Sequence, residues 1–71
     1  MNAAADRWAR AQALARGLAD ELEPNGGLSY DDAFAAGDLV MAELRVELSR
    51  RGLALCDDGA GLWVVARDLA D

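Results

Sequence analysis

Carboxylates are the one class of side chain numerous enough in this sequence to suggest chemistry. The 71 residues contain thirteen Asp and Glu residues, seven arginines, and neither lysine nor histidine. A histidine base, a lysine Schiff base and a P-loop lysine are therefore all excluded. Two adjacent carboxylate pairs remain, but Asp31-Asp32 has the pattern of a helix start and Asp57-Asp58 that of a turn. We therefore expect a protein that is not an enzyme.

The other residues that could react or bind also have simpler interpretations. Cys56 lies among apolar residues, which favours a buried thiol over a reactive one. The stretch beginning at Asp57 lacks the alternate-residue spacing and the closing glutamate of a calcium loop. Gly59-Ala60-Gly61 follows two aspartates, which would repel phosphate, and it opens no helix. The sequence therefore predicts no metal, phosphate or cofactor site.

The composition predicts one small domain over residues 1–71 that does not cross a membrane. Its net charge is −6, and 54% of its residues are apolar. No apolar run approaches the roughly 20 residues of a membrane-spanning helix, and no signal peptide is visible. A single cysteine forms no internal disulfide, which fits a reducing cytoplasm. Because a domain this short buries only about 60% of its unfolded surface, the apolar excess predicts self-association or a permanent partner.

Residues 3–23 form the first predicted helix. Apolar side chains recur there at steps of three and four, namely at Ala4, Trp8, Ala11, Leu14, Ala15, Leu18, Ala19 and Leu22. Pro24 and the following Asn25-Gly26-Gly27 end this helix. We expect the apolar stripe, including Trp8, to face the core.

Residues 29–51 form either one long helix or a helix-turn-helix. Ser29 begins the segment as a helix cap, and Gly52 follows its end. Across the whole segment a single helical periodicity is kept, which favours one helix, by Ala33, Phe34, Gly37, Val40, Met41, Leu44 and Leu48. The alternative is a break at Gly37, with Asp38 capping the second helix.

Residues 53–66 have the pattern of a β-hairpin with a glycine-containing loop. Pairing Cys56 with Leu62 places one set of side chains on the core, namely Leu53, Leu55, Trp63 and Val65. The alternate side chains of the two strands then form an apolar face that nothing in the chain covers. A second apolar stripe runs along residues 35–46 of the preceding helical segment. The side chains predicted to mediate homodimer formation come from both surfaces: Leu39, Ala42, Val46, Leu62 and Val64.

These elements predict an α+β fold, in which an antiparallel helical hairpin precedes a C-terminal two-stranded β-hairpin. Folding the helices back on each other gathers carboxylates at one end, which we call the acidic pole: Asp20, Glu21, Glu23, Asp31, Asp32, Asp57 and Asp58. No arginine is expected among these seven. Most arginines gather near the opposite end, at residues 7, 10, 50, 51 and 67.

With a break at Gly37, residues 29–66 resemble a winged-helix domain. Ala33 and Gly37 match the small residue and the turn glycine of a helix-turn-helix. The resemblance implies a recognition helix at 38–51 and a wing tip at 57–61. Winged-helix domains commonly bind DNA through Lys and Arg. Here the recognition helix contains acidic residues among its arginines, and the wing tip carries two aspartates. Protein binding is therefore the stronger expectation.

We expect a small acidic protein-binding module that occupies a basic surface of another protein, as small phage-type inhibitors and DNA mimics do. The alternative is a small dimeric winged-helix DNA-binding regulator that uses arginines at the opposite end. A third interpretation is a structural subunit whose apolar faces dock into a larger assembly. Binding to nucleic acid or membrane is not expected.

Overall fold

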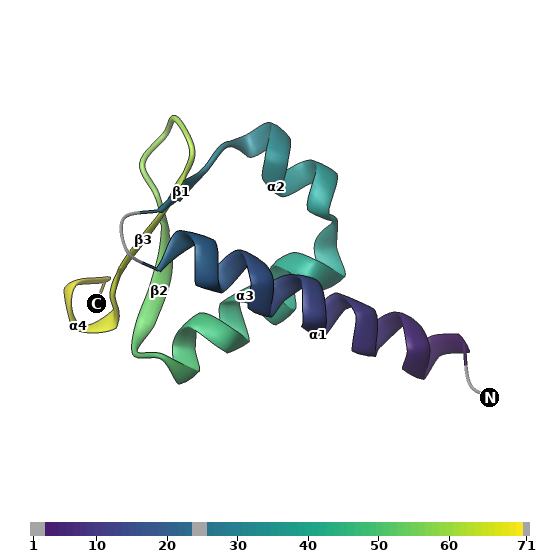
Figure 1. Cartoon of the computed structure of the whole chain (residues 1–71). Coiled ribbons are helices and arrows are strands. Elements are labelled where there is room, and N and C mark those ends of the chain that lie inside the picture. The colour runs from purple at the N-terminus through teal and green to yellow at the C-terminus, as the bar shows by residue number, and fades with distance from the viewer. Residues whose placement is uncertain (1–2, 24–25, 71) are drawn as a thin grey trace.

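A computed structural model describes residues 3–23 and 26–70 of the chain (Figure 1). The elements follow in the order α1 (Ala3–Leu22), β1 (Gly27–Leu28), α2 (Tyr30–Ala36), α3 (Asp38–Arg50), β2 (Leu53–Asp57), β3 (Leu62–Ala66) and α4 (Arg67–Ala70). Helices therefore precede a C-terminal antiparallel β-hairpin, which confirms the predicted α+β class. The predicted turn residues Pro24 and Asn25 lie outside the described residues.

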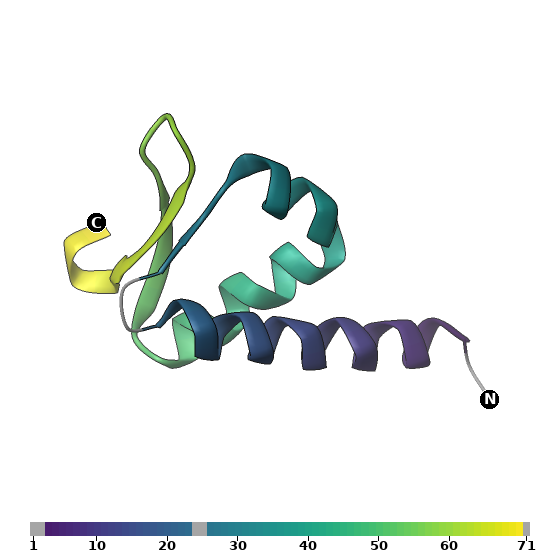
Figure 2. The same ribbon diagram turned by 45° about the horizontal axis from the view of Figure 1, so that its top comes forward.

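Helix α1 confirms the first predicted helix, but only part of its apolar stripe is buried. Ala11, Ala15, Ala19 and Leu22 face the core, whereas Trp8 and Leu14 are about half exposed. Trp8 lies near the start of α1, which has 20 residues against 13 in α3. At about 1.5 Å per residue, the N-terminal part of α1 extends beyond its neighbour (Figure 2). The prediction of a core position for Trp8 is therefore wrong.

The chain breaks at Gly37, so the favoured single helix over residues 29–51 is wrong and the helix-turn-helix alternative is correct. Gly37 has φ 92° and ψ 161°, a conformation that side-chain-bearing residues rarely adopt. Asp38 is not the cap predicted for it, since Gly37 is the N-cap of α3 and makes no side-chain cap hydrogen bond. The regular spacing of apolar residues hid the break, because Ala33 of α2 and Leu44 and Leu48 of α3 face the core on either side of one glycine.

The break also changes how the long helices pack. Trp8 lies against Glu43, and further along both helices Asp20 lies against Arg51. Helix α3 therefore runs along α1 in the same direction, and the short α2 carries the reversal (Figures 1 and 2). The antiparallel pair of long helices expected from the sequence is replaced by this arrangement.

The sheet has the strand order β1-β3-β2, with both pairs antiparallel. Cys56 pairs with Trp63 and Asp57 with Leu62, one residue away from the predicted register. Since opposed residues share a face, Leu62 and Val64 join Leu53 and Leu55 against the core. The prediction that Leu62 and Val64 form an uncovered outer face is wrong. Trp63 lies on that outer face instead, and it is 47% exposed.

Strand β1 was not expected, because two residues are too few to show a periodic pattern. Gly27 pairs with Trp63 and Leu28 with Leu62. The indole of Trp63 lies against Gly27 so closely that an added Cβ would be 2.8 Å from a ring carbon. Glycine is thus required at this point for the indole to lie across the strand.

Helix α3 lies between α1 and the sheet and supplies the centre of the core. Leu44 and Leu48 are fully buried, and they pack with α1 and with Leu28 of β1. Alanines on the facing side of α1 allow the two helices to approach closely. Helix α4 lies on the opposite side of the sheet from α1 and α3 (Figure 2), and the amide of Arg67 donates to the carbonyl of Gly52 at 2.9 Å.

Replacing Gly37 should weaken the fold more than replacing a glycine within a helix. We expect Gly37→Ala to lower the free energy of unfolding by about 1–3 kcal/mol, because alanine is strained at this positive φ. The control Gly17→Ala lies in α1 with no atom near its added Cβ, and it should stabilise by about 0.5–1 kcal/mol. Urea unfolding followed by circular dichroism measures both, and equal effects would contradict this role of Gly37.

Candidate functional site

The hairpin loop is built around the carboxylates of Asp57 and Asp58. Asp57 Oδ1 accepts a hydrogen bond from the amide of Gly59 at 2.8 Å. Asp58 Oδ1 accepts from the amides of Ala60 and Gly61 at 2.8 and 2.9 Å. Positive φ at Gly59 completes the turn. The interpretation of this pair as a turn is confirmed, and the bonds fix both carboxylates at the end of the hairpin.

The start of α2 lies beside this loop. Ser29 Oγ accepts from the amide of Asp32 at 3.1 Å, which confirms Ser29 as the helix cap. Asp31 and Asp32 occupy the first turn of α2, where the helix dipole favours negative charge. The hydroxyl of Tyr30 donates to Asp57 Oδ1 and connects α2 to the hairpin. Sequence reasoning missed this contact, because Tyr30 and Asp57 are far apart in the chain and no local pattern joins them.

These contacts hold the loop carboxylates in their ionised form. The hydrogen bond from Tyr30, followed by that from Gly59, lowers the pKa of Asp57 below 3.8. Hydrogen bonds lower the pKa of Asp58 as well, first that from the amide of Ala60, then those from the amide of Gly61 and the indole of Trp63. The same contact with Asp57 raises the pKa of Tyr30 above 10. At neutral pH the loop therefore carries two full negative charges.

The structure divides the predicted acidic pole into two parts. Four carboxylates lie on the two segments that the Tyr30–Asp57 hydrogen bond joins, the first turn of α2 and the hairpin loop, and we call them the tip cluster: Asp31, Asp32, Asp57 and Asp58. Within residues 3–23 and 26–70, none of the four has an ion-pair partner. The other three acids lie at the C-terminal end of α1, near the base of the hairpin. The seven predicted acids therefore do not form one surface.

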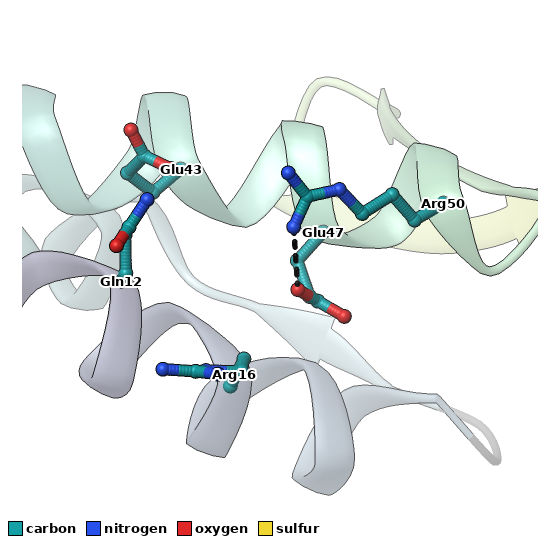
Figure 3. Close-up of a pocket in the computed structure, with 5 residues that line it drawn as sticks. All are labelled: Gln12, Arg16, Glu43, Glu47 and Arg50. Atoms are coloured by element: carbon teal, nitrogen blue, oxygen red, sulfur yellow. Dashed lines mark ion pairs between the residues drawn. The ribbon is translucent and has the colours of Figure 1, made fainter. Parts of the chain in front are cut away.

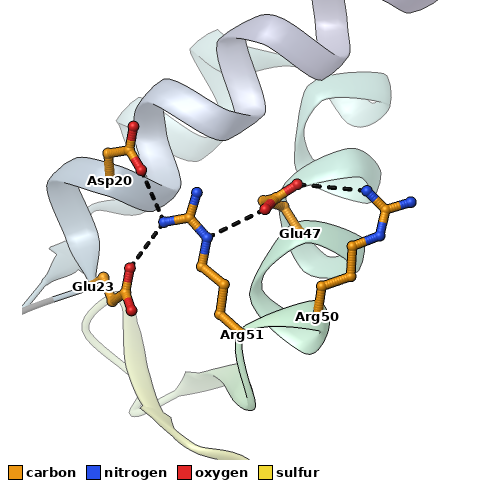
Figure 4. A network of polar contacts seen from close by, with 5 residues as sticks. All are labelled: Asp20, Glu23, Glu47, Arg50 and Arg51. Atoms are coloured by element: carbon orange, nitrogen blue, oxygen red, sulfur yellow. Dashed lines mark hydrogen bonds and ion pairs between the residues drawn. The ribbon is translucent and has the colours of Figure 1, made fainter.

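Arg51 pairs with two of the three acids at the base, Asp20 and Glu23, which corrects the expectation that no arginine lies among them. Arg51 Nη1 is 2.9 Å from both Asp20 and Glu23, and its Nε is 3.2 Å from Glu47 (Figure 4). The Arg51 side chain is 21% exposed, so water screens these contacts only in part. The parallel course of α1 and α3 is the reason, because it brings the C-terminal ends of both helices together.

A small polar hollow lies further along the same two helices. Gln12 and Arg16 of α1 face Glu43, Glu47 and Arg50 of α3 around a space of about 80 Å³ (Figure 3). Arg50 and Glu47 form an ion pair across 3.6 Å, and the Trp8 indole donates to Glu43. A space of this size holds a few waters. It is a polar helix–helix seam rather than a ligand site.

A larger hollow borders the tip cluster. It is an open depression of about 460 Å³ between β1 and the hairpin loop, and Leu62 and Trp63 form its apolar wall. An exposed indole therefore lies next to fixed carboxylates.

The residues predicted to mediate self-association fall into two groups. Leu39, Ala42 and Val46 are exposed along one face of α3, as their spacing suggested. Leu62 and Val64 are partly buried against the core. Phe34, which the helical phase had placed with the core residues, is 90% exposed.

The described residues contain no group of three or more metal-ligating side chains, and Cys56 is a partly buried free thiol. No helix in the described part of the chain is long and apolar enough to cross a membrane. Comparison with known families, curated proteins and solved structures gave no match.

Acid should weaken the hairpin through Asp58. A lowered pKa means that the ionised form favours the fold, so this contribution is present above about pH 4 and is lost as pH falls through the folded pKa. We expect Asp58→Asn, which keeps an oxygen acceptor, to reduce the fall in Tm between pH 4 and pH 2. Glu21→Gln, on the exposed surface of α1, is the matched control. An unchanged acid profile in Asp58→Asn would contradict this assignment.

Arg51 should matter more than its neighbour Arg50. Arg51→Gln leaves three carboxylates without their shared partner, whereas Arg50 is 70% exposed and has one ion pair. We expect Arg51→Gln to lower Tm by several degrees at 20 mM NaCl and Arg50→Gln to have little effect. The difference should shrink in 1 M NaCl, because salt screens the network. Equal losses in the two variants would show that the network adds nothing.

Proposed function

We propose that this chain is a non-enzymatic protein-binding module of winged-helix-like topology, and that its tip cluster docks on a basic surface of another protein. The order α1-β1-α2-α3-β2-β3 supports the topology, because the helix-turn-helix precedes a hairpin whose strand β3 also pairs with β1. Ala33 packs against the core and Gly37 adopts a positive φ, as the two motif positions require.

The observation that carries the proposal is the unpaired charge of the tip cluster. Asp20 and Glu23 of the predicted pole share Arg51, whereas Asp31, Asp32, Asp57 and Asp58 have no ion pair among the described residues. Hydrogen bonds hold the two loop carboxylates in place, so little order is lost when a partner binds them. Such a surface suits clustered Lys and Arg side chains, including those with which a partner protein contacts nucleic acid.

The hollow beside the tip cluster adds a second reason to favour a basic protein. An incoming Arg or Lys side chain can place its charge near Asp58 while its stem packs on Trp63. Nucleic acid has the opposite charge and would be repelled at this wing tip. A role as an inhibitor or DNA mimic of a nucleic-acid-binding partner follows from the same chemistry.

The alternative function is a winged-helix DNA-binding regulator, and the exposed Arg45 and Arg50 of α3 favour it. In that case α3 would enter a DNA groove. Leu39 and Val46 are exposed on the same helix and offer no contact to phosphate. We therefore place this function second.

A pair of double variants tests the leading proposal. Asp31→Asn/Asp32→Asn removes two charges from the tip cluster, and Asp6→Asn/Glu21→Gln removes two from α1. We expect the first to weaken binding of a fluorescent oligolysine peptide by roughly tenfold at 20 mM NaCl, because it removes the local field. The control should change affinity much less, and fluorescence anisotropy measures both.

The same titration with a 20-base-pair DNA duplex separates the two functions. Equal loss of peptide binding in both double variants would show that only net charge acts, and it would overturn the role of the tip cluster. Salt-dependent binding of the duplex, lost in Arg45→Gln, would support the DNA-binding alternative instead.

A further inference from the structure

The end of the molecule at the α2–α3 turn combines a fully exposed phenyl ring with an apolar hollow. Phe34 is 90% exposed, more than any other large apolar side chain of the described residues. Two residues later, Ala36 and Gly37 line a hollow of about 280 Å³ between this turn and α1. The Phe34 ring, which we call the knob, and this hollow therefore lie at the same end of the fold.

The hollow is of the right size and polarity for an aromatic ring. Leu14, Leu39 and Val40 form its walls, and Leu14 and Leu39 are 54% and 41% exposed. The hollow is an open surface depression that a ring can enter from solvent, and for scale an enclosed apolar cavity of about 150 Å³ holds benzene. Burying such a ring removes apolar area on both sides, which is the main source of affinity at interface hot spots.

The charges around the hollow and beside Phe34 indicate which partner fits this surface. Arg7 and Arg10 line the hollow together with Asp38, and neither arginine has an ion-pair partner among the described residues. Asp31 lies one helical turn before Phe34 on α2, and it has none either. The knob thus carries a negative charge beside it, and the hollow carries an excess of positive charge.

We infer that two copies of this chain associate about a two-fold axis, each inserting Phe34 into the hollow between α1 and the α2–α3 turn of the other. A two-fold interface requires that one patch contain both a feature and its complement, which is the case here. Each contact then occurs twice, and Asp31 of one copy meets Arg7 and Arg10 of the other. This surface differs from the α3 stripe that the sequence suggested, although Leu39 belongs to both.

Sedimentation equilibrium between 5 and 500 µM tests the inference. We expect the wild-type chain to form dimers, and Phe34→Ser to raise the dimer dissociation constant by roughly 30-fold or more. Because Phe34 is exposed, the thermal melt of a Phe34→Ser monomer should stay close to that of the wild type. Val46→Ser is the control on the α3 stripe, and it should leave the dimer intact.

A charge exchange tests the pairing itself. Arg10→Asp and Asp31→Arg should each weaken the dimer, and the double variant should recover most of the loss. A monomeric wild type at 500 µM, or dissociation by Val46→Ser but not by Phe34→Ser, would overturn the inference. Phe34→Ser removes no carboxylate, so peptide binding by the tip cluster is measured on the Phe34→Ser monomer, in which Asp31 is not engaged by a second copy, and the two results stay distinguishable.

Discussion

The reversal at Gly37 is the constraint on which the rest of the structure depends. A positive φ at this residue ends α2 and starts α3 without an intervening loop, so α3 returns between α1 and the sheet. Leu44 and Leu48 then become the only fully buried large side chains of the described core. Had the helix continued through Gly37, these leucines would have moved away from the sheet and left Leu53 and Leu55 without cover.

The core that results is small because α1 contributes alanines. Ala11, Ala15 and Ala19 allow close helix packing, but they bury little area each. Three larger apolar side chains of α1 and α2 consequently remain at the surface, because Trp8, Leu14 and Phe34 are exposed by half or more. A domain of this length cannot enclose them, so the apolar excess of the composition appears as surface.

Local chemistry was predictable from the sequence, and non-local geometry was not. The Ser29 cap, the loop aspartates and the extent of α1 depend on neighbours within four residues, and each was found from its pattern. Strand β1 and the Arg51 network join segments about 25 to 40 residues apart. The hairpin register was also not predicted, because from the sequence alone Asp57 could belong to either the loop or the strand. In the structure Asp57 is the last residue of β2, and its carboxylate accepts a hydrogen bond from Gly59.

The distribution of charge follows from the same geometry. Arg51 ends next to the C-terminal end of α1 only because α3 runs parallel to that helix, and there it offsets Asp20 and Glu23. From Leu53 to Asp57 the hairpin extends about 13 Å, which exceeds the Debye length of about 8 Å at physiological salt. The arginine at the base therefore cannot screen the carboxylates at the tip. The four carboxylates where α2 begins and the hairpin ends therefore keep a charge that Arg51 does not offset.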